Sequence, residues 1–479
     1  MKKILLYTFI IISSLQCKKN SDGGSDNNLP VVTPAALTIN NSTIDNLTPS
    51  TANVNYDISV NPSFKLNFNN KIDRNTVAAI KLNQGSNNVS LNYSWTNGDS
   101  VLLMAPVSSL SYLTKYSLSI TTALASTAGG HLSAALNITL LTKIDSTDKF
   151  PVLTDNELLD KVERQTFKYF WDFGHPVSGL ARERNTSGET VTSGGSGFGI
   201  MSIPVAISRS FITRAEGLGR MQTIVGFLKN TAQKFHGAFP HWLNGTTGTV
   251  IPFSQNDNGA DLVETAYLMQ GLICARQYFD GTDATETTLR NDINSLWNGV
   301  EWNWFRQNNQ NVLYWHWSPN LNWVMNFPIR GWNECLITYV LAASSTNFSI
   351  PANVYTQGWA QNGAMQNNST YYGLTLPLGP ALGGPLFFAH YSFLGIDPNQ
   401  LNDVYANYWT QNVNHTRINY NYCVANPQQN FGYSNLCWGL TASDIANGYT
   451  ASSPTNDVGV IAPTAALSSF PYTPVESMN

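Results

Sequence analysis

The sequence predicts a mainly α-helical protein, in which a ring of helix pairs follows a small all-β sandwich. Composition is the first reason: residues 1–150 contain no Glu and a single Trp, Trp95, whereas every Glu and all other Trp residues come later. The second is that alternating apolar and polar residues, typical of strands, precede this point. The third is that capping motifs and helical apolar spacing follow it. With 479 residues, the chain can form two or three domains, or one large domain with an accessory module.

The first part of the chain has the period of β-strands. Residues 63–68 alternate polar and apolar side chains, as do residues 116–120, and Asn-Gly and Gly-Gly turn signals lie between such runs. We therefore expect a β-sandwich over residues 35–145.

From residue 150 onward the pattern indicates helices. Thr154 with Glu157, and Thr213 with Glu216, have the spacing of capping boxes, and each pair precedes a helical apolar pattern. Helical stretches are expected at about residues 155–172, 197–231, 259–279, 285–305, 331–345, 385–395 and 399–411. Successive helix pairs suggest a closed α/α toroid over residues 150–479, with a cleft at the mouths of its inner helices.

The N-terminus predicts export. Lys2 and Lys3 precede an apolar run, residues 4–15, that is too short to span a membrane, and Cys17 follows at once. We expect a lipoprotein signal over residues 1–17 with lipidation at Cys17, then a linker over residues 18–34; an ordinary secretory signal is the alternative. The expected location is the outer membrane, facing the periplasm or the cell surface, with the lipid anchor as the only membrane contact.

Charge and composition exclude several functions. The net charge of −4 leaves no basic surplus to neutralise phosphates, so we expect no nucleic-acid partner. Residues 193–199 are rich in glycine but lack the Lys of a P-loop and follow no predicted strand, so they indicate a close-approach loop at the cleft rim. The cysteines match no zinc pattern and no cluster of metal ligands is apparent. We expect a monomer without cofactor or metal.

The most informative chemical feature is an acid pair at the start of an amphipathic helix. Asp261 and Glu264 are three residues apart and are neighbours on one side of the predicted helix, beside its apolar stripe. Such a pair is expected to face a polar cleft. The alternative is structural: with Asn258 as N-cap, Asp261 would be the third helical residue, where an acid favours the helix dipole. For a lone acid pair, this structural interpretation is favoured.

Glu334 is the candidate partner of this pair. It lies near the start of a later predicted helix, 334 − 264 = 70 residues after Glu264, and a toroid would bring both helix starts to one mouth. Glycoside cleavage needs one protonated and one ionised carboxyl, and neighbouring carboxyls drive their pKa values apart. Glu334 alone could equally be an ordinary first-turn acid.

Aromatic clusters flank these helices. Residues 239–242 precede the acid pair, and residues 314–317 with Trp323 lie between the pair and Glu334. Flat apolar faces suit sugar rings, but they also fill large cores. For His316, between two indoles, a satisfied place in a wall is favoured over a role in orienting a hydroxyl.

The ordered set of motifs resembles the bacterial glucoamylase-like family, which includes endo-β-1,2-glucanases. The resemblance runs from about residue 155 to 478. It is carried by residues 167–171, 194–199, 214–216, 239–242, 259–271, 330–334, 384–395 and 461–466. The preceding segment resembles bacterial Ig-like modules of surface proteins, through residues 68–73, 101–106, 113–120 and 129–132, and its expected role is that of a spacer.

The resemblance implies an (α/α)6 barrel that hydrolyses β-1,2-glucan, endo-acting, with release of sophoro-oligosaccharides. Its candidate carboxylates match Asp261, Glu264 and Glu334. We expect Glu334 as general acid, Asp261 on the base side and Glu264 in support, in an inverting mechanism. The expected substrate-binding residues are Phe198, His241, Trp242, Asn258, Trp315, His316, Trp317, Trp332 and His390.

Two alternatives stay open beside this hypothesis. One is the same fold acting on another β- or α-glucan, and the other is a non-catalytic surface lipoprotein that binds glycans. Members of the family usually continue with a further helix pair past residues 471–474, whereas this sequence ends at Asn479, so a truncated barrel is a further expectation.

Overall fold

The computed structural model describes residues 34–479, which form two compact units divided after Phe150. Each unit has its own hydrophobic core. The predicted signal peptide, Cys17 and nearly all of the predicted linker lie outside the described residues. From residue 34 onward, no helix is both long and apolar enough to cross a membrane.

The first unit is a sandwich of two sheets, with strand orders β1-β3-β7-β6 and β2-β9-β8-β4-β5. Phe64, Leu66 and Phe68 of β3 alternate with polar residues and are buried, as are Leu118 and Ile120 of β8, so the two sheets pack apolar faces together. This confirms the predicted β-structure. The strands are β1 (Ile39–Ile44), β2 (Asn55–Ile58), β3 (Phe64–Phe68), β4 (Ile80–Gln84), β5 (Asn87–Val89), β6 (Leu91–Thr96), β7 (Val101–Pro106), β8 (Lys115–Ile120) and β9 (Leu136–Thr142).

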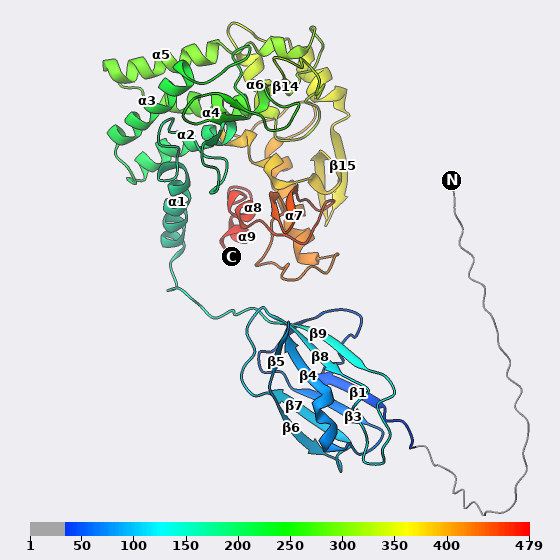
Figure 1. The fold of residues 1–479 in the computed structure, drawn as a ribbon. Helices are drawn as coiled ribbons and strands as arrows, with labels where there is room; N and C mark the ends of the chain where they lie inside the picture. Colours follow the sequence, from blue (N-terminus) through cyan, green and yellow to red (C-terminus); the bar gives the residue numbers. More distant parts are fainter. Residues whose placement is uncertain (1–33) are drawn as a thin grey trace, which may run out of the picture. The chain divides into compact units, whose positions relative to one another are not determined.

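The second unit consists of helices joined by long loops and small sheets (Figure 1). Its helices are α1 (Asp155–Trp171), α2 (Ser193–Ser208), α3 (Arg214–Asn230), α4 (Leu262–Tyr278), α5 (Ala284–Asn298), α6 (Leu336–Ser344), α7 (Tyr408–Ala425), α8 (Pro463–Ser468) and α9 (Pro474–Met478). Its strands are β10 (Thr190–Thr192), β11 (Trp242–Asn244), β12 (Val250–Ile251), β13 (Ala260–Asp261), β14 (His316–Trp317), β15 (Gln366–Tyr371), β16 (Leu374–Leu378), β17 (Ala442–Ile445) and β18 (Gly448–Ala451).

Both predicted capping boxes are present. The Thr154 hydroxyl accepts from the backbone N–H of Glu157, whose carboxylate accepts from the Thr154 backbone, and Thr213 and Glu216 make the same exchange at the start of α3. Each box satisfies backbone donors that the first turn leaves without a helical partner. Local chemistry thus determines where α1 and α3 begin.

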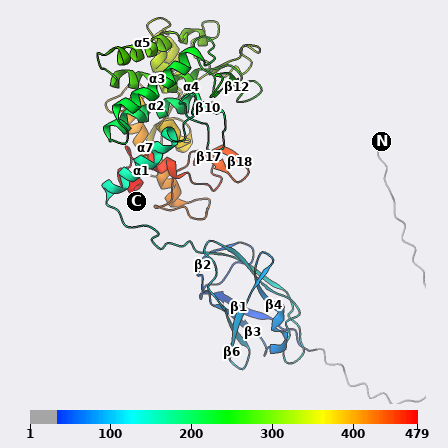
Figure 2. The ribbon, with the colours of Figure 1, turned by 60° about the vertical axis from the view of Figure 1, so that its left-hand side comes forward.

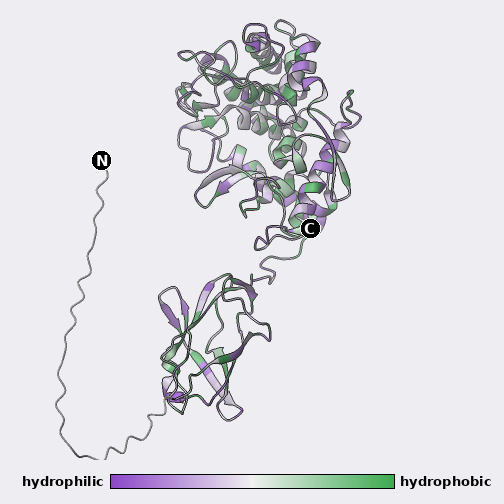
Figure 3. Cartoon of the chain, turned by 90° about the vertical axis from the view of Figure 1, so that its right-hand side faces the viewer, coloured by the Kyte–Doolittle hydropathy of each residue, from purple (hydrophilic) through white to green (hydrophobic). Residues whose placement is uncertain are grey.

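Helix α4 lies at the centre of this unit and packs against α2, α5 and α6. A Cβ built on Gly197 of α2 would lie 2.0 Å from the carbonyl oxygen of Tyr267, and one on Gly271 of α4 would lie 2.2 Å from the carbonyl oxygen of Gly197. The two backbones therefore touch, which only glycine permits. Figure 3 shows hydrophobic residues gathered on the helices inside this unit.

Two predicted helices are wrong. Residues 385–395 form short 3-10 turns, Leu386–Ala389 and Ser392–Leu394, instead of one helix. The stretch expected at 399–411 becomes helical only at Tyr408, because Asp403 holds a turn through the N–H groups of Tyr405 and Ala406, and Asn407 then caps α7. Apolar spacing alone did not reveal these polar turn contacts.

The helical stretch predicted at residues 197–231 consists of two helices, α2 and α3, separated between Arg209 and Thr213, and α3 begins at the predicted capping box. The glycine-rich residues 193–199 are the first turns of α2 and not a loop, and strand β10 precedes them directly. The backbone of these glycines does approach another segment closely, as predicted, but the glycines belong to helix α2 and the segment they approach is helix α4.

Candidate active site

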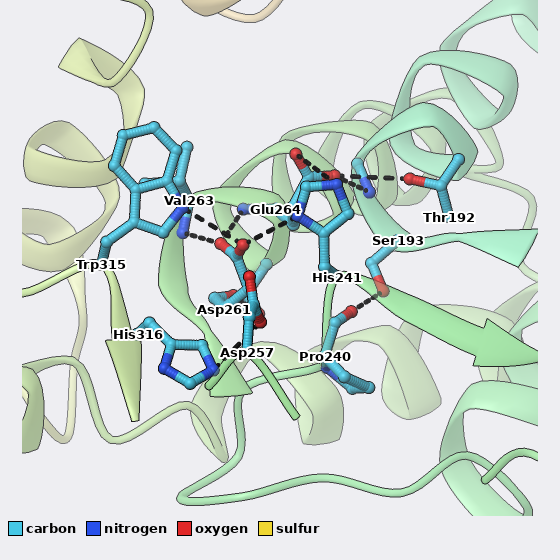
Figure 4. A network of polar contacts seen from close by, with 12 residues as sticks. Thr192, Ser193, Pro240, His241, Asp257, Asp261, Val263, Glu264, Trp315 and His316 are labelled. Carbon is cyan, nitrogen blue, oxygen red and sulfur yellow. Dashed lines mark hydrogen bonds and ion pairs between the residues drawn. The ribbon is translucent and has the colours of Figure 1, made fainter. Parts of the chain in front are cut away.

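Asp261 begins helix α4 and lies at the centre of a polar cluster (Figure 4). Strand β13 pairs with β14 so that Asp261 faces His316, and this pairing fixes the point where the chain turns into the helix. The Oδ1 atom of Asp261 accepts from the backbone N–H groups of Val263 (3.0 Å) and Glu264 (2.9 Å). Asp261 is therefore itself the N-cap, and the alternative with Asn258 in that place is wrong.

The second carboxylate oxygen of Asp261 is also occupied. Oδ2 accepts from Nδ1 of His241 and from Nε1 of Trp315, both at 3.1 Å. The side chain is 1% exposed, so its two oxygens face protein donors on every side. Asp261 joins the start of α4 to two cleft residues from different loops.

His241 is the cation of the cluster. Burial lowers its pKa, but the charge of Glu264 and the hydrogen bond that His241 donates to Asp261 outweigh that effect and raise the pKa to about 9. Its Nε2 lies 4.0 Å from Oε1 of Glu264, and its ring stacks on Phe253 with centroids 4.2 Å apart. A protonated imidazole therefore stands between two carboxylates.

Glu264 reaches across to the start of helix α2. Its Oε2 accepts from the backbone N–H of Gly194 (2.9 Å) and from the hydroxyl of Thr192 (3.4 Å). A Cβ on Gly194 would lie 2.2 Å from that oxygen, so glycine is required there. Burial raises the pKa of Glu264, and the positive charge of His241 opposes the rise.

Glu334 lies directly before helix α6, whose N-cap is Cys335. Its backbone carbonyl accepts from the hydroxyls of Tyr267 and Ser392, which fixes the chain beside α4. Burial raises the pKa of its carboxyl to about 7, and the negative charges of Glu264 and Asp261 act in the same direction. The three predicted carboxylates are thus close enough to influence one another electrostatically.

Asp257 is an acid of the cluster that the sequence analysis missed. It is 8% exposed, and its Oδ1 lies 3.0 Å from Nε2 of the buried His316. Its position four residues before Asp261 was the one available signal, but a loop residue has no helical face to indicate its direction. Because His316 is the strand partner of Asp261, its contact with Asp257 ties the loop before β13 to strand β14.

Among the described residues, His241, Asp257 and Asp261 form one group of possible metal ligands, with ligand atoms all within 4.8 Å of one another. A metal requires a neutral imidazole with a free nitrogen. Nδ1 of His241 lies 3.1 Å from Oδ2 of Asp261, at hydrogen-bond distance. Two carboxylates and one imidazole are a donor set that a divalent cation could use in place of this hydrogen bond.

Several predicted binding residues lie beside the cluster. Besides its bond to Asp261, Trp315 stacks on Phe327 with ring centroids 5.4 Å apart. Trp242 lies edge-on to His241, at 5.9 Å between centroids. Phe198 contacts Tyr267, at 5.3 Å. These rings form an aromatic rim around the carboxylates.

Other predicted residues support loops. Asn258 bonds to the Ser318 hydroxyl (2.6 Å) and to Asn320 (2.8 Å), and so ties the loop before Asp261 to the one after β14. Trp317 lies edge-on to His236, at 5.1 Å between centroids. His316 is buried in the wall, the place that the sequence favoured for it.

Two predicted binding residues have their contacts elsewhere. Trp332 is buried between Phe393 and Tyr408. His390 is also buried, and its Nε2 lies 3.1 Å from the Ser469 hydroxyl; burial lowers its pKa to about 3, so it stays neutral. Both side chains contact residues outside the carboxylate cluster.

Glu183 is a further acid that sequence reasoning missed. The Arg184 guanidinium, 2.6 Å away, lowers its pKa, and the positive charge of His241 acts in the same direction. Glu183 lies in the loop before β10, where its carboxylate bonds Arg184 and Ser187. Since no helix or strand carries it, periodicity gave no signal.

Comparison with known proteins identifies both units. A family model described as "Putative glucoamylase" matches residues 326–479, and a model of a bacterial Ig-like domain matches residues 38–142. The chain is 46% identical over 367 residues to an exo β-1,2-glucooligosaccharide sophorohydrolase (non-reducing end) from Parabacteroides distasonis. That match covers 72% of this chain and 50% of the relative, so the chain spans about half the length of that curated relative.

Solved structures give the same result. An endo-β-1,2-glucanase from Chitinophaga pinensis, in complex with sophorotriose and glucose, is 52% identical with a TM-score of 0.66, over 68% of this chain and 81% of that one. A glucoamylase-like protein from Bacteroides uniformis is 53% identical with a TM-score of 0.67, over 69% of this chain and 81% of that one. The chain therefore belongs to the glucoamylase-like family that its motifs indicated, and carries a bacterial Ig-like domain before the helical unit.

Proposed function

We propose that the helical unit is a glycoside hydrolase that cleaves β-1,2-glucan and that it is built as an (α/α)6 barrel. Two of its relatives are named for hydrolysis of β-1,2-linked glucans. The observation that carries the proposal is the cluster of Asp261, Glu264 and Glu334 around the protonated His241, inside an aromatic rim. Such a site offers an uncharged sugar chain flat faces, a proton donor and an ionised carboxylate.

Glu334 is the proton donor in this proposal. Its pKa of about 7 leaves much of the carboxyl protonated near neutral pH, and a general acid acts best when its pKa is close to the working pH. No cation contributes to the shift, because burial and neighbouring negative charges cause it. Glu334 therefore gives its proton to the glycosidic oxygen as the bond breaks.

Glu264 is the ionised partner. Its side chain is 15% exposed, and both His241 and the N–H of Gly194 favour its charged form. We assign the base side to Glu264 in preference to Asp261, because Asp261 is enclosed and both of its oxygens already accept hydrogen bonds. In this assignment Asp261 orients His241 and caps α4.

Hydrolysis of linear β-1,2-glucan tests the proposal directly. The wild-type chain is expected to release reducing ends, and Glu334→Gln to lower kcat by about 10²–10⁴-fold, as expected for loss of a general acid. Glu163→Gln, on the exposed face of α1, is the matched control and should keep full activity. A wild-type chain that is folded but inactive on this glucan would refute the proposal.

Exo cleavage is the second candidate, because the relative from Parabacteroides distasonis is named as an exo-acting sophorohydrolase. Endo cleavage yields a ladder of sophoro-oligosaccharides early in the reaction, whereas exo cleavage yields sophorose alone. Early product analysis by chromatography separates the two, and the anomer first released reports whether the enzyme inverts.

We also propose export as a lipoprotein, anchored through Cys17 and acting as a monomer. The basic start, the short apolar run and the cysteine that follows support this proposal. Labelling with a radioactive fatty acid in the producing cell should mark the wild-type chain and not Cys17→Ser. Equal labelling of both chains would contradict the lipidation site.

A further inference from the structure

The β17–β18 hairpin places an acid and a tyrosine on the same side. Asp444 and Tyr449 are direct partners in the antiparallel pairing of the two strands. Directly opposed residues project from the same face of such a pair. Whatever fixes the direction of Asp444 therefore fixes the direction of Tyr449.

Asp444 contacts the loop that leads to the carboxylate cluster. Its Oδ1 lies 3.3 Å from Nη1 of Arg184, whose neighbour Glu183 donates its backbone N–H to the carbonyl of Thr190 in β10. Thr192, at the end of the same strand, bonds Glu264. Residues 260 positions apart in the sequence are thus joined. Figure 2 shows the hairpin beside the ribbon that leads into β10.

Tyr449 has no evident structural task. Its side chain is 63% exposed, and within residues 34–479 no hydrogen bond or ring contact to it is recorded. Its strand partner Asp444 contacts Arg184 in the loop before β10, which places the ring on the side of the hairpin that carries this contact. Partial burial raises the pKa of the Tyr449 hydroxyl, and the charges of Asp444, Glu183 and Glu264 act in the same direction. An exposed aromatic face beside a carboxylate cleft is suited to stack on a sugar ring.

We propose that Tyr449 binds a glucosyl unit of the substrate by stacking, and that the Asp444–Arg184 ion pair positions it; this inference rests on the proposed function. Asp444 is a positioning residue, because it acts through the direction of Tyr449 and not by touching the sugar.

The test uses the full chain with linear β-1,2-glucan and with sophoro-oligosaccharides. Tyr449→Ala is expected to raise KM by about tenfold, the loss of one aromatic stack, while kcat stays within about twofold. Tyr449→Phe keeps the ring and should behave as wild type. Tyr372→Ala removes another exposed tyrosine of a two-stranded hairpin, distant from these charges, and should change neither constant.

The positioning role of Asp444 has its own readout. Asp444→Ala should raise KM in the same direction as Tyr449→Ala, and the double variant should add less than the sum of both effects, since each single change removes the same stack. Additive effects would overturn the positioning role. An unchanged KM in Tyr449→Ala, or a loss in Tyr449→Phe equal to that in Tyr449→Ala, would overturn the stacking role.

Binding separates this inference from the proposed function. Calorimetry with a sophoro-oligosaccharide on the Glu334→Gln background should show weaker binding when Tyr449→Ala is added. If the wild type cleaves the glucan but Tyr449→Ala binds as well as its parent, the inference fails and the function stands. If the wild-type chain neither cleaves nor binds, both fail.

Discussion

At the scale of single residues, the site depends on which carboxyl keeps its proton. Burial raises the pKa of both Glu264 and Glu334. At Glu264, the cation of His241 and hydrogen bonds from Gly194 and Thr192 oppose the rise, whereas at Glu334 only its own backbone N–H opposes it. Because each negative charge disfavours the other, Glu334, which lacks the cation, is the carboxyl proposed to keep the proton. This is how two glutamates can take opposite roles in one cleft.

Activity should therefore fall as the pH rises through about 7. The proposed proton donor acts only when it is protonated, and burial raises the pKa of Glu334 to about 7. The plot of kcat/KM against pH should therefore show a falling limb near pH 7. A pH–rate profile on β-1,2-glucan measures the limb. Glu334→Gln should lack it in its residual activity; the same limb in that variant would show that another group controls it.

Stability should also depend on pH through His241. Its folded-state pKa of about 9 exceeds the ordinary value of about 6.5, so the stabilisation is complete below pH about 6.5 and is lost as the pH rises through 9. The shift corresponds to at most about 3 kcal/mol. Urea unfolding at both ends of the range measures the loss, which should shrink in His241→Gln but not in the control His236→Gln. A wild-type free energy that rises over this range would contradict the sign.

At the scale of elements, the sequence predicts best what neighbouring residues determine. The capping boxes at Thr154 and Thr213 require only residues three positions apart, and both are present. Gly194 and Glu264 are 70 residues apart, and their contact depends on how α2 crosses α4. The same holds for Asp444 and Arg184. Motif resemblance could indicate the acids, but it could not give their partners.

The contact between α2 and α4 yields a prediction on stability. Gly197→Ala brings a methyl group onto the carbonyl of Tyr267 and should destabilise the helical unit by about 1–3 kcal/mol, as overpacking does. Gly226→Ala, in α3 with no atom within 4 Å of its built Cβ, should instead stabilise by up to about 1 kcal/mol. Chemical denaturation compares the two, and equal effects would mean that the helices can separate without cost.

At the scale of the whole molecule, the two units have separate hydrophobic cores, and the candidate site lies in one of them. Every member of the carboxylate cluster and every predicted binding residue belongs to the second unit, and the sandwich closes a core of its own. The change in composition near residue 150 shows in the sequence where one core ends and the next begins. The sequence does not show whether the helices of the second unit close into a barrel, because closure depends on how distant helices meet.

Removal of residues 35–145 should therefore leave kcat on soluble β-1,2-glucan within about twofold, because independent domains keep their own stability. Circular dichroism of the shortened chain checks that the helical unit is folded. A folded but inactive shortened chain would show that the sandwich takes part in catalysis. Loss of activity on glucan at the cell surface alone would fit a spacer.

Salt should distinguish the two sets of ion pairs around the cleft. The pairs of His241 with Asp261 and Glu264 are enclosed, and dissolved ions screen such pairs weakly. The Arg184–Asp444 pair, with side chains 46% and 72% exposed, is open to screening. Rising salt should then loosen the hairpin and raise KM for the proposed substrate while kcat holds, so ionic strength would weaken substrate binding at low substrate concentration without changing the proposed chemistry.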